Sequence, residues 1–117
     1  MQTKSFKIPI YFGVVTVVQT SDKEAVKKRF KIDCYDNNPC VYSRSEHYFT
    51  VIFPESNTID INAIAHECTH LANYRLSKIG YKFDYDNDEP YAYLLGYFCE
   101  TIYNILVEFQ KKNKPTI

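Results

Sequence analysis

The sequence lacks an excess of charge of either sign. Lysine and arginine together number 14, aspartate and glutamate also number 14, and the formal net charge is zero. Proteins that bind nucleic acid by neutralising its phosphates normally carry a basic excess. The charge balance therefore argues against that class of partner, and we expect no nucleic-acid binding.

Long hydrophobic runs are also missing. The longest nearly unbroken apolar stretch covers residues 8–18, whereas a helix needs about 20 residues to cross a bilayer. This stretch contains Pro9 and many β-branched residues, and no small-residue cleavage site follows it. We therefore expect neither a membrane span nor an export signal, and we expect a cytoplasmic protein.

Cysteine is scarce, with four residues in the chain, which is few for a disulfide scaffold. Cys68 and Cys99 fall inside expected helices, where reduced cysteines pack as small apolar residues. Cys34 and Cys40 are spaced either to close a small loop or to stand as two free thiols in a reducing cytoplasm. The sequence leaves these two alternatives open.

Aromatic residues are abundant instead. Eleven tyrosines and eight phenylalanines make up 16% of the chain, and apolar residues as a whole make up 45%. Each buried ring removes a large area from water, so a chain of 117 residues can build a core of its own. We expect a single domain over residues 1–117.

Hydrophobic periodicity predicts an α+β fold with helices packed on one antiparallel sheet. Alternation over residues 6–18 predicts one long strand, bent near Pro9 or Gly13. A capping box over residues 21–24 begins a short helix that continues to residue 30. Further strands are expected over residues 31–35, 40–43 and 46–53. Two longer helices are expected over residues 59–79, before Gly80, and from Asp88 to about residue 112, which gives the order β-α-β-β-β-α-α.

A His-Glu-x-x-His motif lies on the first of these longer helices, at residues 66–70. His66 and His70 are four residues apart, so they lie one above the other on the same helix face. Two imidazole nitrogens in this arrangement can hold one Zn²⁺ ion. Glu67 is turned by about 100° from His66, which places it beside the metal as a general base.

The apolar stripe of this helix excludes a core role for the two histidines. If Ile61 is set at 0° and each residue adds about 100°, the apolar side chains fall between about −80° and +60°. His66 and His70 fall at about 140° and 180°. They therefore point into solvent or into a cleft, and an ordinary surface helix with two histidines is the alternative interpretation.

The last helix carries a polar stripe opposite its own apolar face. Glu89, Tyr93, Gly96 and Glu100 share this stripe by the same angular arithmetic. These residue types could supply a third metal ligand and a hydrogen-bond donor to the transition state, and the glycine could permit a close approach of two helices. A partly polar solvent face is the alternative.

The spacing between the two helices resembles that of a known family. Eighteen residues separate His70 from Glu89, and His-Glu-x-x-His followed at this spacing by glutamate is the ligand pattern of the gluzincin metallopeptidases. Residues 87–92 loosely resemble the Asn-Glu-x-x-Ala segment around the gluzincin glutamate. The small size and the sequence after Asp88 also resemble small metallopeptidases encoded by bacteriophages. The resemblance covers residues 59–105.

This resemblance implies a small zincin-like domain that hydrolyses peptide bonds. It makes His66, His70 and Glu89 the ligands of one Zn²⁺ ion and Glu67 the general base, while Glu100, Asp84 and Asp86 are the competing candidates for the third ligand. The donor to the transition state has no fixed match, and Tyr93, Tyr97 and His47 are its candidates, with Tyr93 preferred. The resemblance also implies an edge strand that binds the peptide or protein substrate by strand addition, and residues 46–53 are our candidate for it.

Two other functions remain open from sequence. One is a binding protein that keeps the zincin fold without turnover, since tyrosines favour interfaces. The presence of Glu67, which such a protein does not need, argues against it. The other is a structural zinc site, which needs a fourth protein ligand. Cys68 lies on the wrong helix face for that and Cys99 lies far from the predicted metal.

Overall fold

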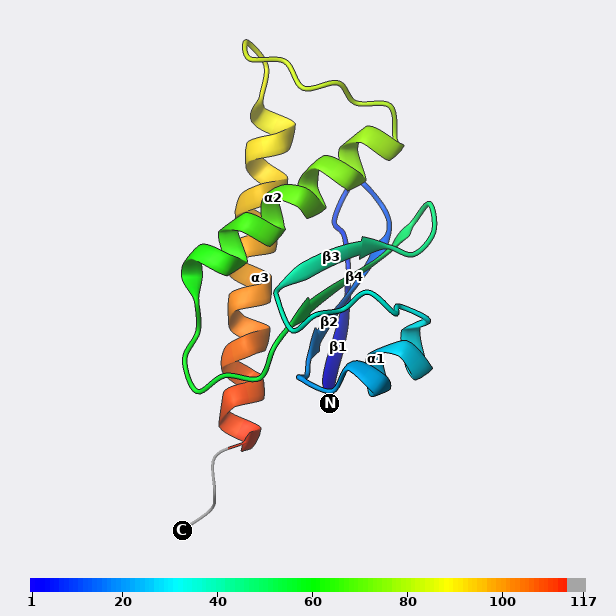
Figure 1. The fold of residues 1–117 in the computed structure, drawn as a ribbon. Helices are drawn as coiled ribbons and strands as arrows, with labels where there is room; N and C mark the ends of the chain where they lie inside the picture. Colours follow the sequence, from blue (N-terminus) through cyan, green and yellow to red (C-terminus); the bar gives the residue numbers. More distant parts are fainter. Residues whose placement is uncertain (114–117) are drawn as a thin grey trace.

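A four-stranded mixed sheet and three helices form an α+β domain (Figure 1). The structure is a computed structural model, and it describes residues 1–113. The strands are β1 (Gln2–Lys7), β2 (Val14–Gln19), β3 (Cys40–Ser43) and β4 (Tyr48–Phe53), and the helices are α1 (Lys23–Phe30), α2 (Ile61–Lys78) and α3 (Glu89–Asn113). The expected α+β class is confirmed. The last four residues of the predicted single domain lie outside the described part of the chain.

The first strand prediction is wrong, because residues 6–18 do not form one strand. They belong to a hairpin in which β1 pairs antiparallel with β2 and Lys7 lies opposite Val14. The intervening turn places Ile10, Phe12 and Gly13 at positive φ, and Ile8 N–H donates to the carbonyl of Gly13 at 2.9 Å. Alternation of apolar residues is the same on both arms of a hairpin, so periodicity alone did not reveal the reversal.

The sheet order is β1-β2-β4-β3, with β2 and β4 parallel and the two outer pairs antiparallel. The prediction that residues 46–53 form an edge strand is therefore wrong, because β4 pairs on both sides. The edge nearest to α2 is β3, as Figure 1 shows. Residues 31–35 form no strand either, and the element order is β-β-α-β-β-α-α.

Helices cover both faces of the sheet rather than one. Helices α2 and α3 pack on one face over a core that includes Val15 and Val17 of β2. A smaller cluster on the other face joins Val18 to Val26 and Phe30 of α1. Successive residues of a strand point to opposite faces, which is why Val17 and Val18 belong to different clusters. Each face of the sheet thus carries a hydrophobic cluster.

Helix α2 matches its prediction to within two residues at each end. Its N-cap is Asp60, whose carboxylate accepts a hydrogen bond from the backbone N–H of Ala63 at 3.1 Å. Helix α1 is capped by Asp22, one residue after the Ser21 that the capping box indicated. Helix α3 begins at Glu89, directly after Asp88, as the sequence predicts. No helix within the described part of the chain is long and apolar enough to cross a membrane.

Candidate metal centre

His66 and His70 lie on the exposed side of α2, with their imidazole rings in edge-on contact at 74° between ring planes. Their Nε2 atoms are 3.3 Å apart and their ring centroids are 4.9 Å apart. Two nitrogens bound to one tetrahedral Zn²⁺ at about 2.0–2.1 Å are separated by about 3.3–3.4 Å. The two side chains therefore have the separation that a shared metal ion requires.

Glu67 completes this group, although its side chain is almost fully buried. Its ligand atoms and those of the two histidines all lie within 4.8 Å of one another. Burial raises the pKa of Glu67, and the neighbouring His66 and His70 partly oppose this rise. Within residues 1–113 no other set of three histidine, cysteine or acidic side chains comes as close together. The donor set, two imidazoles and a carboxylate, is one that zinc accepts.

The edge strand β3 borders this group. Helix α2, which carries Glu67, packs beside β3. Burial raises the pKa of the Cys40 thiol to about 11, and the Glu67 carboxylate adds to the rise. Cys34 and Cys40 are both free thiols in the structure, and the Cys34 sulfur lies 3.2 Å from the hydroxyl of Tyr42. The sequence left open whether Cys34 and Cys40 close a small loop or remain free thiols, and in the structure they are free thiols.

The other predicted site residues lie on α3, apart from the histidine group. Glu89 is exposed in the first turn of α3 and does not belong to the group of three. Tyr93, one turn further on, is 46% exposed. Gly96 shares their stripe, but a side chain built at Gly96 would meet nothing within 4 Å. The expectation that this glycine permits close helix contact is therefore wrong.

The two other donor candidates are engaged elsewhere. The ring of Tyr97 packs edge-on against Phe6 at 6.1 Å between centroids. The Nδ1 atom of His47 lies 3.3 Å from the guanidinium of Arg75. Because a guanidinium only donates hydrogen bonds, this nitrogen of His47 acts as the acceptor. Tyr93 is thus the candidate donor whose side chain is not held in such a contact.

Glu100 lines a separate groove between α2 and α3. The groove is lined by Glu100, Cys99 and Tyr103 of α3 and by Ile61, Ile64 and Ala65 of α2. On the helical wheel of α2, Ile61 and Ala65 lie at about 0° and 40°, more than about 100° away from the midpoint of the two histidines. The groove with Glu100 therefore opens on a different side of α2.

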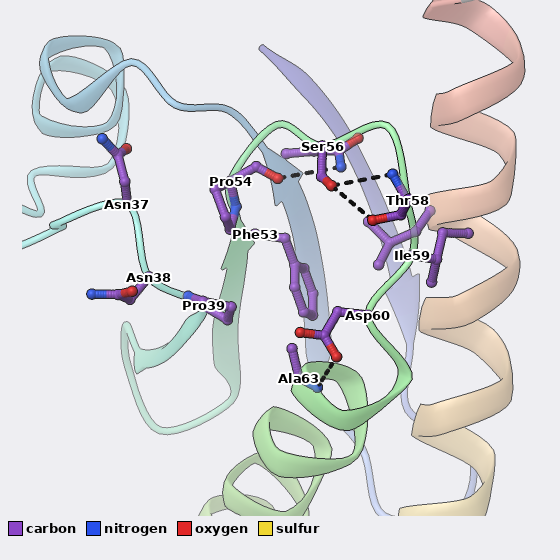
Figure 2. Close-up of a pocket in the computed structure, with 12 residues that line it drawn as sticks. Asn37, Asn38, Pro39, Phe53, Pro54, Ser56, Thr58, Ile59, Asp60 and Ala63 are labelled. Atoms are coloured by element: carbon purple, nitrogen blue, oxygen red, sulfur yellow. Dashed lines mark hydrogen bonds between the residues drawn. The ribbon is translucent and has the colours of Figure 1, made fainter.

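A further cavity, of about 260 Å³, lies at the start of α2 (Figure 2). It is enclosed by the turn over residues 37–39, the loop after β4 and Leu106 of α3. Figure 2 shows Asp60 directed toward Ala63, so its carboxylate serves to cap the helix. None of the three residues of the histidine group lines this cavity, which makes it separate from the candidate metal centre.

Arg75, which the sequence analysis did not identify, fixes α2 against the sheet. Its side chain is fully buried, and it donates to the carbonyls of Phe12 and Glu46 at 3.2 and 3.3 Å. Its guanidinium carbon also lies 5.3 Å from the ring centre of Phe49. Arg75 falls at about −40° on the helical wheel, inside the apolar stripe. A charged residue at that angle was the signal in the sequence.

The close fit around Arg75 also explains Gly13. Gly13 has a φ of 103°, and a side chain there would come within 2.6 Å of the Arg75 guanidinium. Both the backbone conformation and the space therefore require glycine at this turn. Arg75 thus joins the helix that carries the histidines to both loops at one end of the sheet.

We expect Arg75→Ala to lower the free energy of unfolding by about 2–4 kcal/mol. The variant leaves a cavity and removes the donor from the carbonyl groups of Phe12 and Glu46. Chemical denaturation followed by circular dichroism measures the change. As a matched control, Arg29→Ala removes an exposed arginine that lies over Phe30, and we expect a loss of at most about 1 kcal/mol. Equal losses in the two variants would contradict the bridging role of Arg75.

Comparisons with models of protein families, with curated proteins and with solved structures find no match to this chain. The functional argument therefore depends on the residues and their geometry.

Proposed function

We propose that this chain is a zinc-dependent metallopeptidase with a small zincin-like fold. The observation that carries the proposal is the 3.3 Å separation of the His66 and His70 Nε2 atoms beside the buried carboxylate of Glu67. His66 and His70 would hold the ion, with Glu89 as the proposed third ligand, although Glu89 lies outside the group of three in this structure. When bound, zinc supplies a Lewis acid that polarises a peptide carbonyl and lowers the pKa of water toward neutrality.

Glu67 acts as the general base in this proposal. Its carboxylate accepts the proton of the attacking water and passes it to the nitrogen of the departing amine. Its position next to His66 in the chain and within the group of three favours this role, because a general base must lie within reach of the proton that it accepts. Tyr93 is the candidate to donate a hydrogen bond to the carbonyl oxygen of the substrate, which becomes negatively charged in the transition state.

The peptide substrate would bind along β3. This strand is at the edge of the sheet and beside α2, so its outer backbone groups are free to pair with an extended peptide. Because α2, which carries Glu67, packs beside β3, a peptide bound along β3 would place its scissile bond near the general base. Strand addition uses backbone groups and accepts many sequences, so it supplies affinity rather than specificity.

The metal content of the purified protein tests the proposal. We expect one zinc ion per chain, measured by elemental analysis of protein prepared without chelators and again after zinc is added back. Hydrolysis of unfolded casein by the zinc-loaded protein, inhibited by 1,10-phenanthroline, is the expected activity. Protein that contains no zinc in either preparation would refute the proposal.

The third ligand requires its own test. Glu89 follows the α2–α3 connection (residues 79–88), whose Tyr81 and Phe83 line one pocket together with Asn73 and Ser77 of α2. Asn73 and Ser77 fall at about 120° and 160° on the helical wheel, close to the angles of the two histidines. The connection thus leads to Glu89 from the side of α2 that bears the histidines, which supports Glu89 over Glu100.

We expect Glu89→Gln to weaken zinc binding by more than the 10- to 100-fold that the loss of an outer-sphere partner typically costs. Competition with a chromogenic chelator measures the affinity. Glu100→Gln is the matched control on the same helix stripe, and we expect its affinity to stay within about twofold of the parent value. The reverse result would assign the third ligand to Glu100.

A further inference from the structure

The α2–α3 connection and α2 together form a pocket with largely aromatic walls. The pocket has a volume of about 300 Å³ and is lined by Asn73, Tyr74, Leu76 and Ser77 of α2, Tyr81 and Phe83 of the connection and Tyr91 of α3. The ring of Phe83 meets those of Tyr91 and Tyr85 edge-on, at 5.4 and 5.0 Å between centroids. The ring of Phe83 therefore packs against aromatic rings of both the connection and α3.

This pocket adjoins the candidate metal centre. Tyr74 lines the pocket and also stacks against His70, with 6.2 Å between ring centroids and 21° between ring planes. The pocket continues the face of α2 that carries the histidines, and Ser77, at its far end, lies about 10 Å along the helix axis from His70. An extended peptide covers this distance in about three residues.

The charge near the pocket is negative. The segment over residues 79–89 contains four carboxylates, at Asp84, Asp86, Asp88 and Glu89, and one lysine, Lys82. The Tyr81 hydroxyl donates to the carbonyl of Asn87 at 2.7 Å, which joins this wall of the pocket to the acidic segment. The pKa of Tyr81 is raised, first by desolvation and then by Asp84 and Asp88. None of the residues that line it is positively charged.

Aromatic faces next to carboxylates favour a cationic guest. A cation is attracted both to the negative face of an aromatic ring and to the carboxylates. Arginine suits such walls better than lysine, because its planar guanidinium stacks on rings and is less strongly hydrated. A neutral polar side chain of the same shape would gain neither interaction.

We propose that this pocket binds an arginine side chain of the substrate, within about three residues of the bond that is cut. The inference deepens the proposed function and rests on it for the position of the cut. Binding of arginine to the pocket does not itself require hydrolysis, so the two can be tested separately.

The test compares two fluorescein-labelled peptides, one with a central arginine flanked by alanines and one with citrulline in its place. Citrulline keeps the length and shape of arginine but has no charge. Fluorescence polarisation with zinc-loaded Glu67→Gln protein measures binding without turnover. We expect the arginine peptide to bind at least about fivefold more tightly than the citrulline peptide, in the range of a partly desolvated cation–π contact.

Two variants, made in the same Glu67→Gln background, locate this preference. Phe83→Leu removes an aromatic face but keeps an apolar side chain, and Asp84→Asn removes a charge but keeps the oxygen that accepts from the N–H of Asp86. We expect each to reduce the preference for arginine at least about twofold. Phe12→Leu and Asp33→Asn make the same changes at exposed positions outside the pocket, and we expect them to leave the preference unchanged.

Equal affinity for the arginine and citrulline peptides would overturn the inference, as would equal losses in the pocket variants and their controls. If the parent protein cleaves casein and the two peptides bind equally, the inference fails and the proposed function stands. The protein could instead cleave no peptide and still bind the arginine peptide more tightly, with a preference that Phe83→Leu reduces. In that case the pocket is an arginine site and the proposed hydrolysis fails.

Discussion

Glu67→Gln is expected to retain its zinc and to lose about 10²- to 10⁴-fold in the rate of peptide hydrolysis. The amide has nearly the shape of the carboxylate, so the ion and the fold should be unaffected. It cannot accept the proton of the attacking water, and the loss of a general base typically has this effect. The rate is measured with zinc-loaded protein and fluorescent casein, and the zinc content is measured on the same sample.

The matched control for this variant is Glu55→Gln. Glu55 is an exposed glutamate in the loop after β4, so its amide should leave both zinc content and rate unchanged. Turnover by Glu67→Gln at the rate of the parent protein would show that Glu67 is not the base. A metal-loaded parent that hydrolyses no peptide would favour the alternative of a binding protein without turnover.

Substitution of either histidine by alanine is expected to remove the metal. His66 and His70 each supply one nitrogen of a pair 3.3 Å apart, so the loss of either leaves an incomplete site. The affinity for zinc should fall by more than the 10- to 100-fold expected for an outer-sphere partner. Competition with a chromogenic chelator gives the affinity of each variant.

The third histidine provides the control. His47→Ala removes an imidazole that contacts Arg75 and not the histidine pair, so we expect its zinc affinity to equal that of the parent. Because His66 and His70 are exposed, their alanine variants should change the unfolding free energy of the metal-free protein by at most about 0.5 kcal/mol. Full zinc retention in His66→Ala or His70→Ala would contradict the assignment of the ligands.

The sheet shows where local patterns stop being informative. Residues 6–18 alternate as one strand would, but the turn after Lys7 divides them into β1 and β2. The positive φ values of Ile10 and Phe12 occur at residue types that rarely adopt them, so no turn motif indicated this reversal. The interior position of β4 depends on its parallel pairing with β2 across 28 intervening residues, which periodicity within each strand does not specify.

The α2–α3 pair shows the same limit at the candidate site. The start of α3 after Asp88 could be predicted, because an acidic cap and Pro90 in the first turn are local signals. The part of α3 that lies nearest to His66 could not be predicted, because it depends on how the α2–α3 connection packs. In the structure, Cys99 and Glu100 line one groove together with Ala65. The connection is not a simple short turn, because its aromatic residues line a pocket with α2.

The sequence by itself determined the helix that carries the histidines and the pairing of those histidines. The apolar stripe and Gly80 define α2, and a spacing of four residues on a helix of 3.6 residues per turn brings two side chains together in any fold. Only the tertiary structure decided the burial of Glu67 beside β3, the burial of Arg75 and the separation of Glu89 from the histidines. These depend on contacts between residues far apart in the chain, and such contacts follow from how whole elements pack, which no local spacing encodes.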